Sequence, residues 1–457
     1  MNRVASRSMI VLVLVLALAV GLVFFFGEFL TKSGDWILFS GSPYVYDSEG
    51  KIDTGTVSDR NGVLLADLTE GRRYASDPTV REAMLHWVGD RQGNIRAPYV
   101  AEYTPQMLGY DLANGAYNYG GQKGNITLTL SARLQTVAQE AMGDYRGTVA
   151  VYNYKTGELL CAVTTPNFDP DAPPDLSADT EGLYEGGYWN RFMQSKYIPG
   201  SIFKIVTLAA ALETMPELTQ ERFTCQGVYE LGGGDVTCER SHGTQNLKEA
   251  FCNSCNCVFA QITQRLGAER LAKFVDYCGV TAPVSFDGYT SAAGNFDVEG
   301  ATLEQVAWSG IGQHKDQIYP CAYLAFLGCG AGGGVGAKPY VVSQVSVGEQ
   351  VTYRAASHNT DRILSKNTAQ TIREYMRNNV QTKYGVENFP NLVICAKSGT
   401  GEVGGDKKPN AMFAGFVAEE SCPLAFIVAI EDGGYGTQVC VPVISTILEA
   451  CAAEIHQ

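Results

Sequence analysis

The sequence predicts an α+β domain built on an antiparallel five-stranded sheet flanked by helices. Two strand-like runs occur early in the chain, three occur late, and helical patterns fill the long segment between them. Because strands come from both ends of the sequence and helices lie between them, the sheet must be assembled from both ends. A single apolar helix and a small irregular region precede this domain.

The first expected element is an apolar helix near the N-terminus. Residues 8–27 form a run of 20 residues without a charge, and such a helix spans roughly 30 Å, the thickness of a bilayer core. Arg3 and Arg7 precede the run, so the positive-inside bias places residues 1–8 in the cytoplasm and the rest of the chain outside. A cleaved signal peptide is the alternative, but no small-x-small site follows the run. We therefore expect a single-pass protein with residues 9–27 in the membrane.

A small region with little periodicity is expected at residues 28–125, where Gly, Tyr, Asn and Pro are scattered. The main domain, expected at residues 126–457, opens with strand-like alternation at 126–130 and helical spacing at 131–142. The five strands of the sheet are expected at 148–152, 159–163, 392–399, 411–417 and 424–430. Helical patterns occupy 201–213, 247–266, 271–278, 303–309 and 439–454.

The charge balance excludes one class of partner. The 457 residues carry 34 basic and 48 acidic side chains, a net charge of -14, and no basic run of five or more. Nucleic-acid phosphates are held by clustered Lys and Arg, so we exclude nucleic acid as a partner.

The thirteen cysteines raise two questions. Cys225 and Cys238 bracket a Gly-rich turn, where two hairpin strands would bring them within bridging range. The sequence is compatible with a disulfide between them and equally with two free thiols. Cys252, Cys255 and Cys257 crowd together, but no second Cys or His cluster stands at zinc-like spacing. We expect structural cysteines, no metal and no cofactor.

The most informative stretch is Tyr-Ile-Pro-Gly-Ser-Ile-Phe-Lys at residues 197–204. Pro199 and Gly200 break the incoming chain, so a helix is expected to begin at or near Ser201. Residues three apart share a helix face, which lets the Ser201 hydroxyl meet the Lys204 amine. Burial and a nearby cation lower a lysine pKa, so that a neutral lysine can take the serine proton.

Two later motifs make this pairing specific. A bare Ser-x-x-Lys occurs by chance, as it does at residues 48–51. The serine at 201 starts an expected helix and is followed, in order, by Ser-Cys-Asn at 254–256 and by Lys-Ser-Gly-Thr at 397–400 on an expected strand. The serine at 48 lies in a Gly-containing loop, where no helix would hold it beside the lysine. The order nucleophile, proton relay and substrate-binding strand indicates acyl transfer through a serine.

Each residue of these motifs has a chemical use. Ser254 can relay the proton to the leaving amine, Lys397 supplies a second cation, and Asn256 can hydrogen-bond a substrate amide. The backbone N–H of Thr400 can join that of Ser201 in an oxyanion hole. The predicted catalytic residues are Ser201, Lys204, Ser254 and Lys397, and the predicted substrate-binding residues are Asn256, Ser398, Gly399 and Thr400.

The three motifs resemble those of penicillin-binding proteins and active-site serine β-lactamases. The form of residues 197–204, the Asn-Arg pair at 190–191 and the single anchor narrow the resemblance to class B penicillin-binding proteins. Residues 126–457 are similar to the family's transpeptidase domain, and the Asp-Arg-Asn-Gly at 59–62 resembles the start of its pedestal. The chain departs from the family at His314 and Tyr319, where Gly and Thr are usual, which bears on recognition of the acceptor.

The resemblance implies a membrane-anchored peptidoglycan D,D-transpeptidase with an extracytoplasmic catalytic domain. Ser201 would form an acyl-enzyme with stem peptides and be acylated by β-lactam antibiotics. The resemblance also implies a dimerisation-like pedestal at residues 28–125 and a membrane glycosyltransferase as partner. The alternatives are a serine β-lactamase or β-lactam sensor domain, and a largely non-catalytic assembly partner of a membrane glycosyltransferase.

Overall fold

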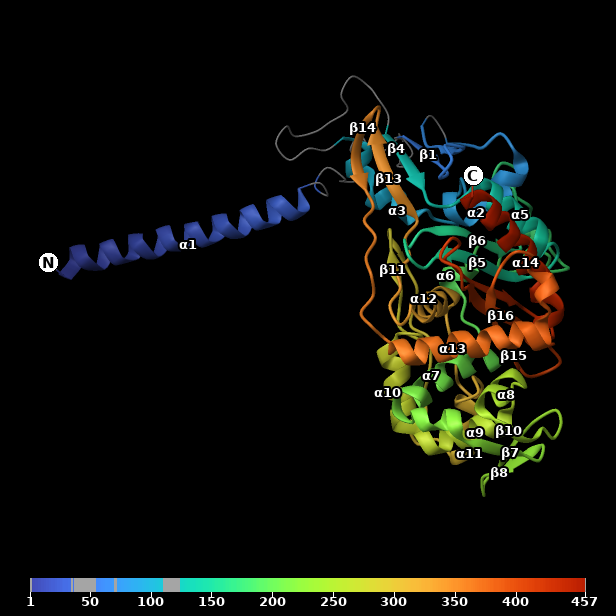
Figure 1. The fold of residues 1–457 in the computed structure, drawn as a ribbon. Helices are drawn as coiled ribbons and strands as arrows, with labels where there is room; N and C mark the ends of the chain where they lie inside the picture. The colour runs from blue at the N-terminus through green and yellow to red at the C-terminus, as the bar shows by residue number, and fades with distance from the viewer. Residues whose placement is uncertain (1, 34–35, 37–54, 70–71, 110–123, 457) are drawn as a thin grey trace.

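The computed structural model describes residues 2–33, 36, 55–69, 72–109 and 124–456 (Figure 1). The helices are α1 (Asn2–Lys32), α2 (Pro78–Val88), α3 (Pro98–Glu102), α4 (Thr104–Met107), α5 (Ala132–Met142), α6 (Arg191–Gln194), α7 (Lys204–Thr214), α8 (Leu247–Cys252), α9 (Asn256–Leu266), α10 (Ala268–Cys278), α11 (Leu303–Ser309), α12 (Pro320–Ala331), α13 (Lys366–Asn379) and α14 (Gly436–Ile455). The strands are β1 (Thr56–Ser58), β2 (Leu64–Asp67), β3 (Arg73–Tyr74), β4 (Gly124–Leu128), β5 (Gly147–Asn153), β6 (Leu159–Thr165), β7 (Arg222–Cys225), β8 (Val228–Glu230), β9 (Asp235–Thr237), β10 (Gly243–Asn246), β11 (Ser285–Phe286), β12 (Tyr289–Thr290), β13 (Val342–Val347), β14 (Gln350–Arg354), β15 (Ile394–Gly401), β16 (Asn410–Val417) and β17 (Leu424–Ile430). The chance Ser-x-x-Lys at residues 48–51 lies outside the described residues.

The central element is the predicted five-stranded sheet, and the structure confirms it. Its strand order is β15-β16-β17-β5-β6, and every neighbouring pair is antiparallel. The late strand β17 lies in the middle and pairs with the early strand β5, from Leu424 opposite Asn153 to Ile430 opposite Gly147. The two ends of the domain sequence therefore form one sheet.

Helices cover both faces of this sheet. On β5, Val149 and Val151 face a core cluster that includes residues of α5 and α14. Ala150 and Tyr152 face a second cluster that includes residues of α7 and α12. Burial on both faces explains why these strands read as continuous apolar runs and not as an alternation.

Two helices, residues 7–32 within α1 and residues 436–455 of α14, are long and apolar enough to cross a membrane. The side chains of α14 pack into the sheet, where Ile444, Ile447 and Leu448 are fully buried, so α14 is a core helix. The apolar side chains of α1 are exposed, and α1 extends away from the folded body (Figure 1). By length and composition, α1 is the candidate membrane anchor.

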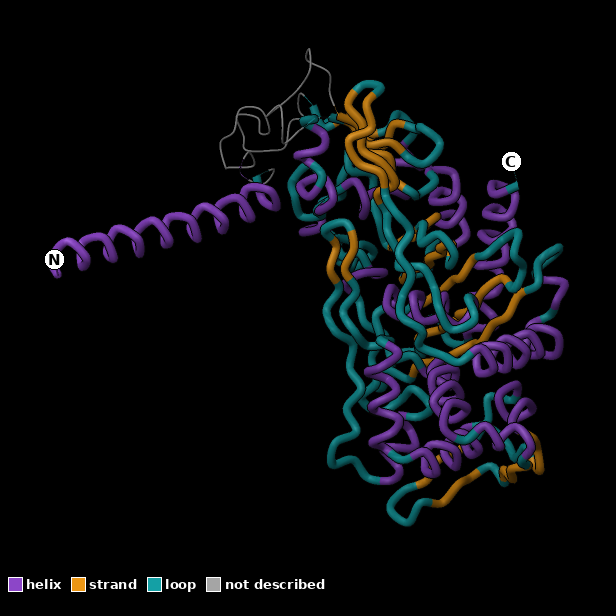
Figure 2. Tube along the Cα trace, turned by 60° about the vertical axis from the view of Figure 1, so that its left-hand side comes forward, coloured by secondary structure: helices purple, strands orange, loops and turns teal. Residues whose placement is uncertain are grey.

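A second sheet combines distant segments in the order β14-β13-β4-β1-β2-β3. β4 pairs in parallel with β1 and antiparallel with β13. Figure 2 shows this sheet at the end of the molecule nearest α1, with short hairpin strands at the opposite end. The expected boundary between residues 125 and 126 falls inside β4, so the segment 342–354 shares a sheet with the proposed pedestal.

The predicted single helix at residues 247–266 is wrong, because the chain forms α8 and α9 with a break between them. A capping box of Asn246 and Glu249 starts α8. At the break, Ser254 has a φ of 52°, a left-handed conformation that a residue other than glycine rarely adopts. The apolar periodicity continues through both helices and does not reveal the break.

Candidate active site

The nucleophile motif forms a tight turn at the start of α7. Residues Gly200–Phe203 make a 3₁₀ turn, η4, and the α-helix begins at Lys204. Residues three apart eclipse in a 3₁₀ turn, and Lys204 Nζ lies 2.9 Å from Ser201 Oγ. Gly200 has a φ of 52° and touches the Thr400 carbonyl so closely that a Cβ would collide with it. The glycine therefore lets this turn approach β15.

The Lys204 amine is held by the second motif. Its Nζ lies 2.7 Å from both the Ser254 carbonyl oxygen and Asn256 Oδ1, and 3.1 Å from Ser254 Oγ. Asn256 Nδ2 donates to the Thr237 carbonyl at 2.8 Å, which fixes the amide with Oδ1 toward the lysine. A neutral amine satisfies both fixed acceptors with its two N–H groups. Its lone pair then remains for the Ser201 hydroxyl.

Both lysines of the site are fully buried. Burial lowers the pKa of Lys204 from its ordinary value to about 8. Burial, followed by the nearby charge of Lys204, lowers the pKa of Lys397 well below its ordinary value. The Phe259 ring lies 5.7 Å from Lys204 Nζ, and the Phe251 ring lies 5.9 Å from Lys397 Nζ. This apolar packing gives the site a lysine that is partly neutral near neutral pH.

The second predicted lysine completes a continuous chain of polar groups. Lys397 Nζ lies 3.1 Å from Ser254 Oγ and 2.9 Å from the Ser398 carbonyl oxygen. The Ser254 hydroxyl thus lies 3.1 Å from both lysine nitrogens. A proton on Lys204 can pass to Ser254, which is the relay geometry that the motif order predicts.

The strand β15 lies at the edge of the five-stranded sheet and packs against η4. A Cβ on Gly399 would lie 2.8 Å from the Pro199 carbonyl oxygen and 3.0 Å from the backbone nitrogen of Ile202. The Thr400 carbonyl accepts a hydrogen bond from Gln313 Nε2 at 3.2 Å. Small residues at this contact bring the strand edge beside the nucleophile.

A cleft of about 930 Å³ opens above these contacts. Six of the eight predicted site residues line it, namely Ser201, Ser254, Asn256, Ser398, Gly399 and Thr400. The two predicted lysines lie beneath the cleft, in hydrogen-bonding contact with its lining. Of the two departures from the family pattern, His314 lines the cleft, whereas Tyr319 is buried at the start of α12.

Sequence reasoning missed one polar residue of this site. Tyr384 ends the π-helical segment η6 (Val380–Tyr384) that follows α13. Its hydroxyl accepts a hydrogen bond from the Ser398 backbone N–H at 3.0 Å and lies 3.0 Å from Ser398 Oγ. Either hydroxyl can donate in this second contact, so Tyr384 holds both the backbone and the side chain of Ser398 in place. No motif marks Tyr384 among the 24 tyrosines of the chain.

The disulfide left open between Cys225 and Cys238 is not formed, because all thirteen cysteines are free. Cys238 Sγ lies 3.7 Å from Cys255 Sγ, and Cys225 Sγ lies 3.5 Å from His242 Nδ1. The separation of the Cys238 and Cys255 sulfurs exceeds the roughly 2.05 Å of a disulfide bond. The hairpin strands do bring these two cysteines near each other, but as part of a larger group.

Residues 147–449 match the protein family described as penicillin binding protein transpeptidase domain. Among curated proteins, the peptidoglycan D,D-transpeptidase PbpA of Mycolicibacterium smegmatis is 27% identical over 356 residues. That alignment covers 72% of this chain and 72% of the relative. The matched family is the one that the three motifs resemble.

Solved structures share the fold. Penicillin-binding protein A from M. tuberculosis, in a penicillin G acyl-enzyme complex, aligns with a TM-score of 0.73 and 24% identity over 88% of this chain and 99% of that chain. Penicillin-binding protein PBP2 of Helicobacter pylori, in a complex with MreC, aligns with a TM-score of 0.63 and 20% identity over 71% of this chain and 63% of that chain.

Proposed function

The chain belongs to the family of penicillin-binding protein transpeptidase domains, and from this premise we propose that it is a peptidoglycan D,D-transpeptidase acylated by β-lactams at Ser201. The proposed catalytic roles rest on one observation. The buried Lys204 amine lies 2.9 Å from the Ser201 hydroxyl and 3.1 Å from the Ser254 hydroxyl, at the floor of a cleft. A curated relative is named for the same activity.

Acylation follows from these contacts. Neutral Lys204 takes the proton of Ser201 as Oγ attacks the penultimate D-alanine carbonyl carbon of a stem peptide. The carbonyl oxygen becomes an oxyanion, which the backbone N–H groups of Ser201 and Thr400 stabilise. The oxyanion collapses and the C–N bond breaks. The proton passes from Lys204 through Ser254 to the leaving amine, and terminal D-alanine departs.

Transfer reverses this proton path. The amine of a neighbouring stem peptide attacks the ester carbonyl and gives up a proton through Ser254 to Lys204. The ester C–O bond then breaks as the new peptide bond is completed, and Ser201 recovers its proton from Lys204. Lys397 holds Ser254 in place, while Asn256 and Ser398 bind the donor peptide. A β-lactam acylates the same serine, but its leaving amine stays tethered to the acyl group, so the adduct persists.

The rate of acylation should rise with pH. Lys204 acts as base only when neutral, and its pKa is about 8. At about pH 6 only about one in a hundred Lys204 amines is neutral, so the acylation rate constant should be about 100-fold below its high-pH plateau. Stopped-flow measurement with a chromogenic β-lactam from about pH 6 to pH 9.5 checks this. A flat profile, or a rate that falls as pH rises, would contradict Lys204 as the base.

The function is tested with the full chain in detergent micelles. After labelling with a fluorescent penicillin, we expect a stable covalent adduct, and paired synthetic stem peptides should yield a cross-linked product with release of D-alanine. Rapid hydrolysis of free antibiotic would instead indicate a β-lactamase. Absence of both adduct and cross-linked product would indicate an assembly protein without this chemistry.

We also propose that α1 anchors the protein with residues 1–8 in the cytoplasm and the catalytic domain outside. The apolar run in α1 and the basic side chains of Arg3 and Arg7 support this orientation. In spheroplasts, external protease should digest the catalytic domain while an N-terminal tag stays protected. Protection of the catalytic domain from the protease would indicate the opposite orientation in the membrane.

A further proposal concerns the partner. We propose that α1 and the pedestal region at residues 28–125 pair with a membrane glycosyltransferase. In this proposal residues 126–457 form the catalytic domain. The exposed apolar side chains of α1 offer a surface for a second membrane protein. A structural neighbour is seen in complex with MreC, so association with a second protein has a precedent in this fold. Photo-crosslinking from α1 in membranes should capture a glycosyltransferase, and replacement of α1 by an unrelated apolar helix should abolish the product.

A further inference from the structure

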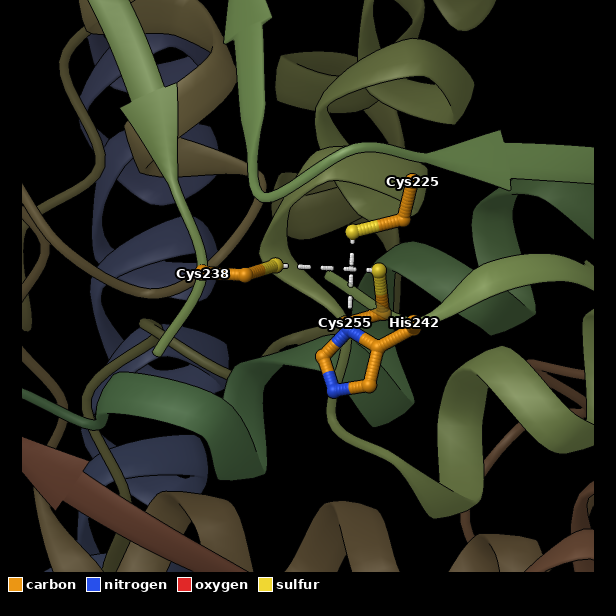
Figure 3. A group of neighbouring side chains, drawn as sticks. All are labelled: Cys225, Cys238, His242 and Cys255. Carbon is orange, nitrogen blue, oxygen red and sulfur yellow. Dashed lines mark hydrogen bonds between the residues drawn. The ribbon is translucent and has the colours of Figure 1, made fainter. Parts of the chain in front are cut away.

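Three cysteines and a histidine converge beside the active-site cleft. Cys225, Cys238, His242 and Cys255 point their sulfur and nitrogen atoms toward one another, as Figure 3 shows. These four ligand atoms all lie within 4.8 Å of one another. Cys225 and Cys255 are buried, while Cys238 and His242 are partly exposed and line the cleft.

Two of the six separations among the ligand atoms have the values of a tetrahedral metal site. Bonds of about 2.3 Å to sulfur and about 2.0 Å to nitrogen in a tetrahedron place two sulfurs about 3.8 Å apart and a sulfur and nitrogen about 3.5 Å apart. The Sγ atoms of Cys238 and Cys255 are 3.7 Å apart, and Cys225 Sγ and His242 Nδ1 are 3.5 Å apart. The other four separations are at most 4.8 Å, so small side-chain adjustments would place all four ligand atoms around one ion.

The chain segments that carry the four residues are short. Cys225 ends β7, Cys238 follows β9, His242 precedes β10, and Cys255 precedes α9. The pairs β7–β10 and β8–β9 are two-stranded sheets that depend on packing against α8 and α9, because a lone hairpin is marginal in water. An ion bound by all four side chains would tie both hairpins to the N-terminus of α9.

A backbone contact also suits a metal-bound thiolate. The N–H of Cys257 points at Cys238 Sγ, with the nitrogen 3.4 Å from the sulfur. Hydrogen bonds from the surroundings orient ligand atoms and tune their basicity at metal sites. The group therefore has a donor set and a supporting contact.

We propose that Cys225, Cys238, His242 and Cys255 bind one Zn²⁺. Three thiolates and an imidazole form a ligand set that Zn²⁺ favours, and four protein ligands leave no open coordination position. The site is therefore structural, and the ion takes no part in acyl transfer.

The ion also positions the proton relay, and this second part rests on the proposed function. Cys255 stands between Ser254 and Asn256, the two residues that hold the Lys204 amine. Ser254 has a left-handed backbone, a conformation that persists only when its surroundings hold it. Fixing Cys255 on a metal holds the adjacent relay serine in place.

The metal content of the purified protein tests whether the four side chains bind zinc. The full chain, purified in detergent without chelators, should contain one zinc per chain by inductively coupled plasma mass spectrometry. Cys225→Ser and His242→Ala should each lose most of this zinc. The matched control is Cys252→Ser, which removes a nearby thiol that contacts Thr382 and lies outside the group; it should keep the metal.

A second measurement decides the question if a variant fails to fold. Wild-type protein reconstituted with Co²⁺ should show thiolate-to-cobalt charge-transfer absorption, and Cys252→Ser should show it too. Wild-type protein without bound metal and without this absorption would overturn the proposal. A disulfide between any two of the three cysteines, found by peptide mapping of unreduced wild-type protein, would also overturn it.

The rate of acylation tests whether the zinc ion positions Ser254. Removing zinc with a chelator should slow acylation by a fluorescent penicillin by roughly 10- to 100-fold, because a small displacement of Ser254 misaligns the relay. One equivalent of Zn²⁺ should restore the rate. An unchanged rate in stripped protein would overturn the positioning role while leaving the zinc site intact. Failure of zinc-loaded protein to take any label would count against the proposed function and not against zinc binding.

Discussion

Ser201→Ala should abolish covalent labelling by fluorescent penicillin and release of D-alanine from stem peptides. The alanine lacks the oxygen that forms the acyl bond, the Oγ that lies 2.9 Å from Lys204 Nζ in the wild type. Loss of a serine nucleophile lowers turnover by about 10⁶-fold in well-studied hydrolases. We expect at least about 10⁴-fold here, measured as the second-order rate constant of labelling.

The control is Ser48→Ala, which removes the serine of the other Ser-x-x-Lys in the chain. It should label at the wild-type rate. Equal labelling of Ser201→Ala and wild type, or loss of label in the control alone, would show that the nucleophile has been assigned to the wrong serine.

Lys204→Met should slow acylation by about 10³-fold while the protein stays folded. Methionine fills much of the buried space of the lysine side chain, but it offers no lone pair to the Ser201 proton. General-base catalysis contributes about 10²- to 10⁴-fold in comparable steps. The loss should appear in the acylation rate constant near pH 8, the value of the Lys204 pKa, and circular dichroism should confirm the fold.

Lys196→Met is the matched control, because Lys196 is exposed on the segment just before the nucleophile turn. Its acylation rate should stay within about twofold of wild type. A folded Lys204→Met that acylates within about tenfold of wild type would mean that another group takes the proton. Lys397, which also contacts Ser254, would then be the first candidate.

The strands of the central sheet were predictable because burial on both faces makes each of them a compact apolar run. β16 and β17 are buried at every position, and the expected runs at residues 411–417 and 424–430 coincide with them within one residue. The second sheet was not predictable in the same way. β13 and β4 lie more than 200 residues apart in the chain, and no local pattern encodes their pairing.

The active-site residues also fall into those that the sequence predicts and one that it does not. The three motifs could be found because acyl transfer requires particular residue types, and the structure brings Ser201, Lys204, Ser254 and Lys397 into mutual contact. Tyr384 carries no such signature, because its role depends on where the end of a helix meets β15.

The four-residue cysteine and histidine group was missed for a different reason. The sequence drew attention to Cys252, Cys255 and Cys257, which crowd together along the chain, yet only Cys255 belongs to the group. Cys238 and His242 are only four residues apart, a spacing that common zinc motifs use, but Cys225 and Cys255 each lie 13 residues from that pair. Folding, and not sequence proximity, brings them together.

The pairing of β5 with β17 has a consequence for how the protein reaches its active form. β5 cannot acquire its central neighbour until residues 424–430 have been synthesised, although it begins at Gly147. Until then, β5 and β6 present an apolar, unpaired edge that can associate with other chains. Sequence separation of this size also slows folding, because a long loop must close before the contact forms. Ribosome stalling or nonsense mutation before Leu424 should therefore produce aggregation-prone chains, and not a shortened enzyme with partial activity.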